Sequence, residues 1–228
     1  MCFRWSQFFV KKNYLFFVPG FPFLSGLKKS SMQQAFNYLS KKDKTLKFIL
    51  KNFGEPIIQI REQGFASMCH IILEQQVSIA SAKATYIKLE NHFQQITPIK
   101  IAQASDKDLK SCGLSRQKTI YVKDLAEKVL TKTIDFSSFP NKNETQIRTE
   151  LITIKGVGNW SIEVYLMFCL QMPDIIPLGD IAIKNTMIEL YQTQTLNEME
   201  KISNNWAPYR TYATYIIWHY YLKKRGKI

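Results

Sequence analysis

The chain has 228 residues, enough for one sizeable domain or for two small domains that pack closely together. Its content of 46% hydrophobic and 21% charged residues is typical of a soluble globular protein and excludes a chain too polar to fold. A formal net charge of +13 and a pI near 9.5 indicate a polyanionic partner, with nucleic acid the first candidate and an anionic membrane surface the second.

Cysteine and histidine spacing argues against a metal centre. Cys2, Cys69, Cys112 and Cys169 are scattered and form no C-x-x-C pair, and the three histidines form no zinc pattern. We therefore expect no side-chain metal site, and free thiols in a reducing compartment. That compartment would be the cytoplasm of a bacterium or, in a eukaryote, the nucleus.

Residues 1–31 differ in composition from the rest of the chain. They contain five basic residues, no acidic residue and nine aromatic residues. The uncharged run 13–27 is short and interrupted by proline and glycine, which excludes a transmembrane helix, and no convincing cleavage site supports a secretion signal. We interpret residues 1–31 as a loosely ordered or non-native extension, with translation starting at Met32, and residues 32–228 as the folded domain.

From Met32 onward, apolar periodicity and capping residues predict an all-α domain of about ten helices without a sizeable sheet. The predicted helices include 33–40, 43–52, 65–74, 79–93, 160–171 and 209–223. Segment 65–74 is apolar on most sides and should be buried. Ser105 with Asp108 forms a predicted capping box, Asn141 with Glu144 is expected to open another helix, and Pro208 should occupy the first position of the last helix.

A glycine turn, Lys155-Gly156-Val157-Gly158-Asn159, separates two of these predicted helices. Glycines at alternate positions allow a sharp bend in which amide groups point outward beside the positive end of the next helix. Such a turn suits a phosphate group, although most turns of this kind merely connect helices.

Asp180 is the candidate catalytic residue. From local sequence alone it is an N-cap, since it stands at the start of a predicted helix. However, the hairpin, Trp160, the Pro177-x-x-Asp180 element and the later Trp206-x-Pro208-x-Arg210 segment together resemble the helix-hairpin-helix superfamily of DNA glycosylases. The similarity is greatest to the 3-methyladenine DNA glycosylase II group and extends over residues 33–224.

The resemblance implies a two-lobed helical fold, with the hairpin and the aspartate on the rim of a cleft. It also implies base excision: a purine flipped out of double-stranded DNA is released by hydrolysis of its N-glycosidic bond. An alkylated purine is cationic and leaves readily, and charge then develops on the sugar, where the Asp180 carboxylate would stabilise it or activate water. An aromatic pocket would attract the cationic base, and the candidates are Trp218, Trp160, Tyr165 and Tyr215.

The same resemblance assigns the contacts with DNA. The hairpin residues Lys155, Gly156, Val157, Gly158 and Asn159 would bind phosphate, and backbone carbonyls at Ile154 and Gly156 would hold a K⁺ or Na⁺ ion. Gln76 corresponds to the residue that fills the gap left by the flipped base, and Lys118 is a candidate phosphate contact. Arg210 is either a phosphate contact or the ion-pair partner of a carboxylate.

Two other functions compete with this interpretation. Helix-hairpin-helix elements also serve as DNA-binding modules without catalysis, but such a module has no use for a carboxylate facing DNA. A glycosylase for oxidised or mismatched bases is the other alternative, and Trp160 and the absence of a C-terminal cysteine cluster argue against it. We expect a monomer without an organic cofactor or iron–sulfur cluster, no membrane association and, because Trp160 directly follows Asn159, no lyase activity.

Overall fold

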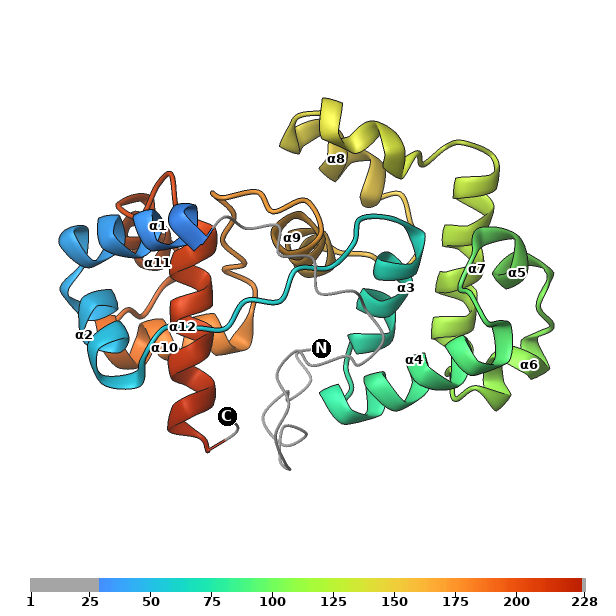
Figure 1. Ribbon diagram of the computed structural model, residues 1–228, viewed down its shortest axis with the longest axis horizontal. Coiled ribbons are helices and arrows are strands. Elements are labelled where there is room, and N and C mark those ends of the chain that lie inside the picture. Colours follow the sequence, from blue (N-terminus) through green and yellow to red (C-terminus); the bar gives the residue numbers. More distant parts are fainter. Residues whose placement is uncertain (1–28, 227–228) are drawn as a thin grey trace. The chain divides into compact units, whose positions relative to one another are not determined.

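The computed structural model describes residues 29–226, and these residues contain twelve α-helices, one 3₁₀ helix and no strand (Figure 1). The predicted all-α fold class is therefore confirmed. No helix among the described residues is long and apolar enough to cross a membrane. The chain divides into two compact units.

Unit 1 contains residues 62–170 and is built around a buried helix. Its helices are α3 (Phe65–Glu74), α4 (Ile79–Phe93), α5 (Pro98–Gln103), α6 (Asp106–Ser111), α7 (Arg116–Leu130), the 3₁₀ helix η1 (Phe136–Asn141), α8 (Glu144–Leu151) and α9 (Asn159–Phe168). Helix α3 contacts α4, α7 and α9, and eight of its ten residues are buried, as its sequence predicts.

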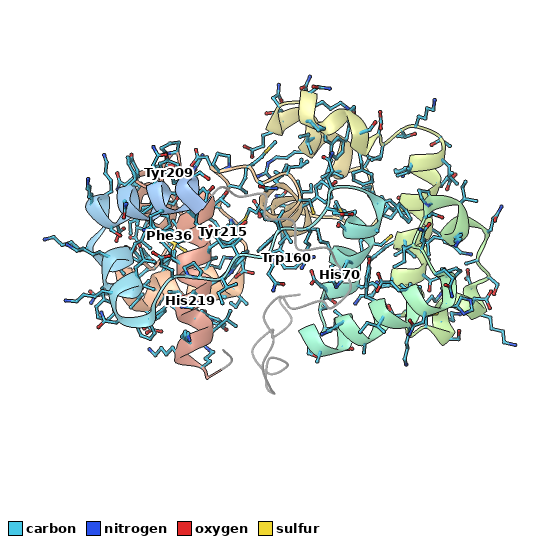
Figure 2. All side chains as sticks on the ribbon, viewed as in Figure 1. Phe36, His70, Trp160, Tyr209, Tyr215 and His219 are labelled. Atoms are coloured by element: carbon cyan, nitrogen blue, oxygen red, sulfur yellow. The ribbon has the colours of Figure 1, made fainter. Side chains whose placement is uncertain are left out.

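Unit 2 combines residues 29–61 with residues 171–226. Its helices are α1 (Lys29–Lys42), α2 (Lys44–Phe53), α10 (Ile181–Tyr191), α11 (Leu196–Asn204) and α12 (Arg210–Lys224). Helix α12, drawn in red, contacts α1, α2 and α10 (Figure 1). Figure 2 labels Phe36, Tyr215 and His219 on the helices of this unit, and all three are buried.

Several predicted helix boundaries need correction. Helix α1 begins at Lys29 and not after Met32, while residues 1–28 lie outside the described part of the chain. The capping box before α8 is formed by Asn143 and Gln146, because Asn141 belongs to the preceding 3₁₀ helix. Pro208 precedes the last helix, whose N-cap is Tyr209.

The helix after the hairpin also differs from the prediction. It begins at Asn159 and ends at Phe168, three residues before the predicted end. Gln171 has a left-handed backbone with φ of 54°, which is incompatible with a continuing helix. The capping box of Ser105 with Asp108 is confirmed.

Candidate functional site

The hairpin between α8 and α9 has a backbone that requires glycine at one position only. Gly156 has φ of 75°, and a Cβ added there would lie 2.2 Å from the ring of Tyr121. Gly158 has an ordinary extended backbone, and a Cβ there would meet no atom within 4 Å. The fold therefore requires glycine at position 156. At Gly158 the fold has room for a side chain, and glycine leaves that space open.

The amide groups of this hairpin are available to a ligand. Val157 donates its N–H to the Ile154 carbonyl, but no hydrogen bond within the described residues occupies the amides of Gly156 or Gly158. Both glycines are exposed, and Gly158 directly precedes the first turn of α9. Unpaired amides beside the positive end of a helix form a binding site for an anion such as phosphate.

Asp124 on α7 holds the first residue of the hairpin. Its carboxylate accepts a 2.9 Å hydrogen bond from the Lys155 amide and lies 3.3 Å from the Lys155 ammonium and 3.0 Å from that of Lys128. Burial raises the pKa of the Asp124 carboxyl, but the hydrogen bonds from Lys155 and Lys128 outweigh burial and hold that pKa below its ordinary value. Lys155 is thus both a partner of Asp124 and, at 66% exposure, accessible at the surface.

Gln75 holds the other side of the hairpin. Its side-chain amide donates to the Gly156 carbonyl and to the Ser161 hydroxyl, each at 2.9 Å. Gln76, the next residue, is exposed and has φ of 56°. A left-handed backbone at a non-glycine residue is strained, and strain of this kind is typical of functional positions.

The predicted cation site has suitable ligands. The carbonyls of Ile154 and Gly156 each accept one hydrogen bond, from Val157 and Gln75 respectively. Each carbonyl oxygen retains a second lone pair, and oxygen is the ligand type that hard cations prefer. Both carbonyls therefore keep the capacity to bind the monovalent cation that the family resemblance implies.

Asp180 lies at the N-terminus of α10 in unit 2, where it is both a helix cap and the partner of an indole. Its Oδ1 accepts hydrogen bonds from the amides of Ala182 and Ile183, at 2.8 and 3.1 Å. The same oxygen accepts a 3.1 Å bond from Nε1 of Trp218 on α12. Three donors fix the orientation of this partly exposed carboxylate, and the positive end of α10 stabilises its charge.

Arg210 stabilises the loop that leads to Asp180. Its guanidinium donates to both oxygens of Asp174, each at 2.8 Å, and its amide donates to the same carboxylate. Thr211, the next residue, donates to the Met172 carbonyl and accepts from the Ile175 amide. Of the two roles predicted for Arg210, the structure therefore provides the ion-pair partner.

Only two of the four predicted pocket aromatics share a unit with Asp180. The rings of Tyr215 and Trp218 lie 6.3 Å apart on α12, with Trp218 partly exposed and Tyr215 buried. Trp160 is half-buried in the first turn of α9 in unit 1 (Figure 2).

One predicted site residue needs correction, and a second has a structural role. Tyr165 is fully buried in unit 1, its ring packs near Phe136 and Phe139, and its hydroxyl accepts from the Gly64 amide, so no face is open to a base. Lys118 donates to the Leu73 carbonyl at 2.6 Å. Burial lowers the pKa of Lys118, and its ammonium caps the C-terminus of α3. The contact of Lys118 with phosphate stays a prediction.

The sequence interpretation missed Asp124 and Gln75. An aspartate inside a helix carries no recognisable signal, since its partner at Lys155 is 31 residues away. Gln75 had a weak signal, its position directly before Gln76. Among the described residues, no cluster of cysteine, histidine or carboxylate side chains could hold a metal ion.

Comparison with known proteins gives consistent matches. A family model described as "HhH-GPD superfamily base excision DNA repair protein" matches residues 69–208. The chain is 29% identical to the alkylbase DNA glycosidase-like protein mag2 of Schizosaccharomyces pombe, over 84% of this chain and 94% of that protein.

Solved structures match at the level of the fold. A DNA-3-methyladenine glycosidase from Bacillus halodurans aligns with a TM-score of 0.74 at 26% identity, covering 87% of this chain and 92% of that one. A 3-methyladenine DNA glycosylase from S. pombe, solved in complex with abasic DNA, aligns with a TM-score of 0.75 at 24% identity, covering 84% and 97%.

Proposed function

The chain belongs to the HhH-GPD superfamily of base excision DNA repair proteins, and we propose that it is a monofunctional glycosylase that releases alkylated purines, of the 3-methyladenine type, from duplex DNA. The observation that carries the proposal is the Asp180 carboxylate, held by two amides and by the indole of Trp218. The names of similar proteins, which refer to alkylated bases and 3-methyladenine, support the substrate class.

The chemistry follows from the charge of the substrate. An N-alkylated purine already carries positive charge, so the base leaves without strong general-acid assistance. As the glycosidic bond breaks, positive charge moves to the sugar, and a fixed anion stabilises that charge without reorganising. Asp180 provides this anion, and a water molecule oriented by the same carboxylate completes the hydrolysis.

The remaining residues are assigned to binding. The amides of Gly156 and Gly158 bind a DNA phosphate, and a K⁺ or Na⁺ ion on the carbonyls of Ile154 and Gly156 would add positive charge to that contact. Gln76 occupies the gap left by the flipped base, and Trp218 contributes an aromatic face to the base pocket. We propose that the protein acts as a monomer, in the bacterial cytoplasm or the eukaryotic nucleus.

The test is base release from methylated duplex DNA under single-turnover conditions. Asp180→Asn should reduce the rate by about 10²-fold or more, the scale for losing one preorganised electrostatic group. Asparagine is as good an N-cap as aspartate, so the variant should melt at nearly the wild-type temperature.

Asp135→Asn is the matched control, because Asp135 caps η1 in the same way and has no proposed role in catalysis. The control should keep the wild-type rate. A near-wild-type rate in Asp180→Asn would reduce Asp180 to a helix cap, and absence of base release by the wild-type protein would contradict the proposed function itself.

A further inference from the structure

The segment that joins α1 to α2 concentrates positive charge on unit 2. Within eleven residues it contains five lysines, all exposed, which we call the lysine surface: Lys41, Lys42, Lys44, Lys47 and Lys51. Helices α1 and α2 contact each other, so the lysines of both helices belong to one region of the unit (Figure 1).

The three lysines of α2 lie on one face of that helix. At about 100° per residue, positions 44, 47 and 51 fall within about 60° of one another. The buried residues Leu46 and Ile49 lie on the opposite side, against the interior of the unit. Helix α2 thus packs Leu46 and Ile49 against the unit and has a free cationic face, while one large apolar side chain, Phe48, is 49% exposed.

The only carboxylate within this segment does not neutralise it. Asp43 accepts the amides of Thr45 and Leu46 on Oδ1, and accepts Trp206 Nε1 and the Tyr191 hydroxyl on Oδ2. It is committed to the cap of α2 and to the interior of the unit.

No other carboxylate compensates for the charge of the lysine surface. Among residues 29–226, none of its five lysines forms an ion pair, whereas Lys123, Lys128 and Lys142 elsewhere in the chain each pair with a carboxylate. The Lys42 ammonium lies 5.6 Å from the ring centre of Tyr38, a cation–π contact that leaves its charge uncompensated. Five uncompensated charges in so short a segment repel one another, so the region is suited to a polyanion.

We propose that the lysine surface is a second DNA-binding surface, which contacts phosphates of duplex DNA without sequence preference and lies on the unit that does not contain the hairpin. Membership of a DNA repair superfamily makes DNA the expected polyanion. A membrane-binding helix needs a broad free apolar face to enter the bilayer, whereas Leu46 and Ile49 of α2 are buried and Phe48 is its one exposed large apolar side chain. The proposal does not depend on base release and goes beyond the catalytic assignment.

The test measures the affinity for an undamaged duplex as a function of salt concentration. Each lysine that neutralises a phosphate contributes about 0.9 to the slope of log affinity against log salt concentration. Replacing Lys44, Lys47 and Lys51 together by glutamine should therefore lower the slope by about 1 to 3 and weaken binding at low salt. Because all three side chains are exposed, the melting temperature should stay unchanged.

The control replaces Lys107, Lys110 and Lys132 by glutamine, which changes the net charge equally. These lysines are also exposed, but each lies close enough to a carboxylate to interact with its charge, namely Asp108, Asp106 and Asp135 respectively. In the control variant, the slope of log affinity against log salt concentration should stay close to the wild-type value.

An unchanged slope in the α2 variant, or an equal loss in the control, would overturn the proposal. So would an effect seen only with duplex RNA or with phosphatidylserine–phosphatidylcholine vesicles. The Asp180→Asn protein can be used in the same titration, so failure of this proposal is distinguishable from failure of the catalytic one.

Discussion

At the scale of a single residue, Trp218 donates a hydrogen bond from its indole to the Asp180 carboxylate. A hydrogen bond to a charged group contributes about 1.5–3 kcal/mol, and about 1.4 kcal/mol corresponds to a tenfold rate change. Trp218→Phe removes the donor and keeps an aromatic ring, so we expect single-turnover base release to slow by about 10- to 100-fold.

A double-mutant cycle separates this orienting role from plain packing. If Trp218 acts through Asp180, combining Trp218→Phe with Asp180→Asn should slow the reaction hardly more than Asp180→Asn alone. Additive losses would show that the indole contributes to the base pocket independently of the carboxylate. Melting temperatures of the three variants control for loss of structure.

Individual residues were predictable to different degrees. Asp180 and Trp218 were named together from the resemblance, and the structure places them within hydrogen-bonding distance. Tyr165 was misassigned because an aromatic residue on an apolar helix has the same periodicity whether it lines a pocket or the core. Gln75 was missed because it contacts a residue 81 positions away, and local pattern carries no information on such contacts.

At the scale of an element, the hairpin makes different demands on its two glycines. Gly156→Ala would place a Cβ within 2.4 Å of the Tyr121 ring on a left-handed backbone, so we expect a loss of about 1–3 kcal/mol in stability. Gly158→Ala meets neither obstacle, and it should melt like the wild type. It should nevertheless bind duplex DNA more weakly, because a methyl group then stands where a phosphate approaches the hairpin.

Thermal melting of the two variants tests the packing argument at Gly156, and their affinity for duplex DNA tests the role of Gly158. Equal stability of both variants would contradict the packing argument at Gly156. Wild-type affinity in Gly158→Ala would mean that the surface of the hairpin at Gly158 does not face DNA.

Helices α3 and α4 have the predicted bounds, α4 because the Ser78 cap marks its start and α3 because its sequence is apolar on most sides. The short elements α5 and η1 escaped prediction, since six residues hold too few turns to establish a period. Helix α11 was missed although Thr195 and Glu198 form a capping box, a signal that the sequence does contain.

At the scale of the whole molecule, unit 2 takes its helices from both ends of the described chain, and unit 1 is the segment between them. Periodicity cannot predict that arrangement, because it assigns faces to helices and not partners to faces. The two-lobed organisation was expected only from the family resemblance. The catalytic candidate Asp180 and the hairpin, for which we propose phosphate binding, consequently belong to different units, and each must be tested by its own variant.

The final prediction concerns the reaction as a whole: the protein should release the base without cutting the DNA strand. A lyase needs a neutral amine that attacks C1′ of the sugar and forms a Schiff base. Directly after Asn159 the chain has Trp160, whose indole nitrogen has no lone pair free for attack. Lys155, the amine within the hairpin, precedes the glycines, and its ammonium lies 3.3 Å from the buried Asp124 carboxylate, which holds it in an ion pair.

Borohydride treatment during reaction with a lesion-containing duplex checks this prediction. We expect free base and an intact abasic strand that breaks only after alkali, with no covalent protein–DNA adduct. An adduct that forms efficiently in the wild type and disappears in Lys155→Ala would instead make Lys155 a nucleophile and the protein a bifunctional enzyme. Asp124→Asn sharpens the experiment, because it weakens the ion pair of Lys155. If the protein is monofunctional, the variant should still form no adduct, because Lys155 precedes the hairpin glycines and the position directly after Asn159 is Trp160.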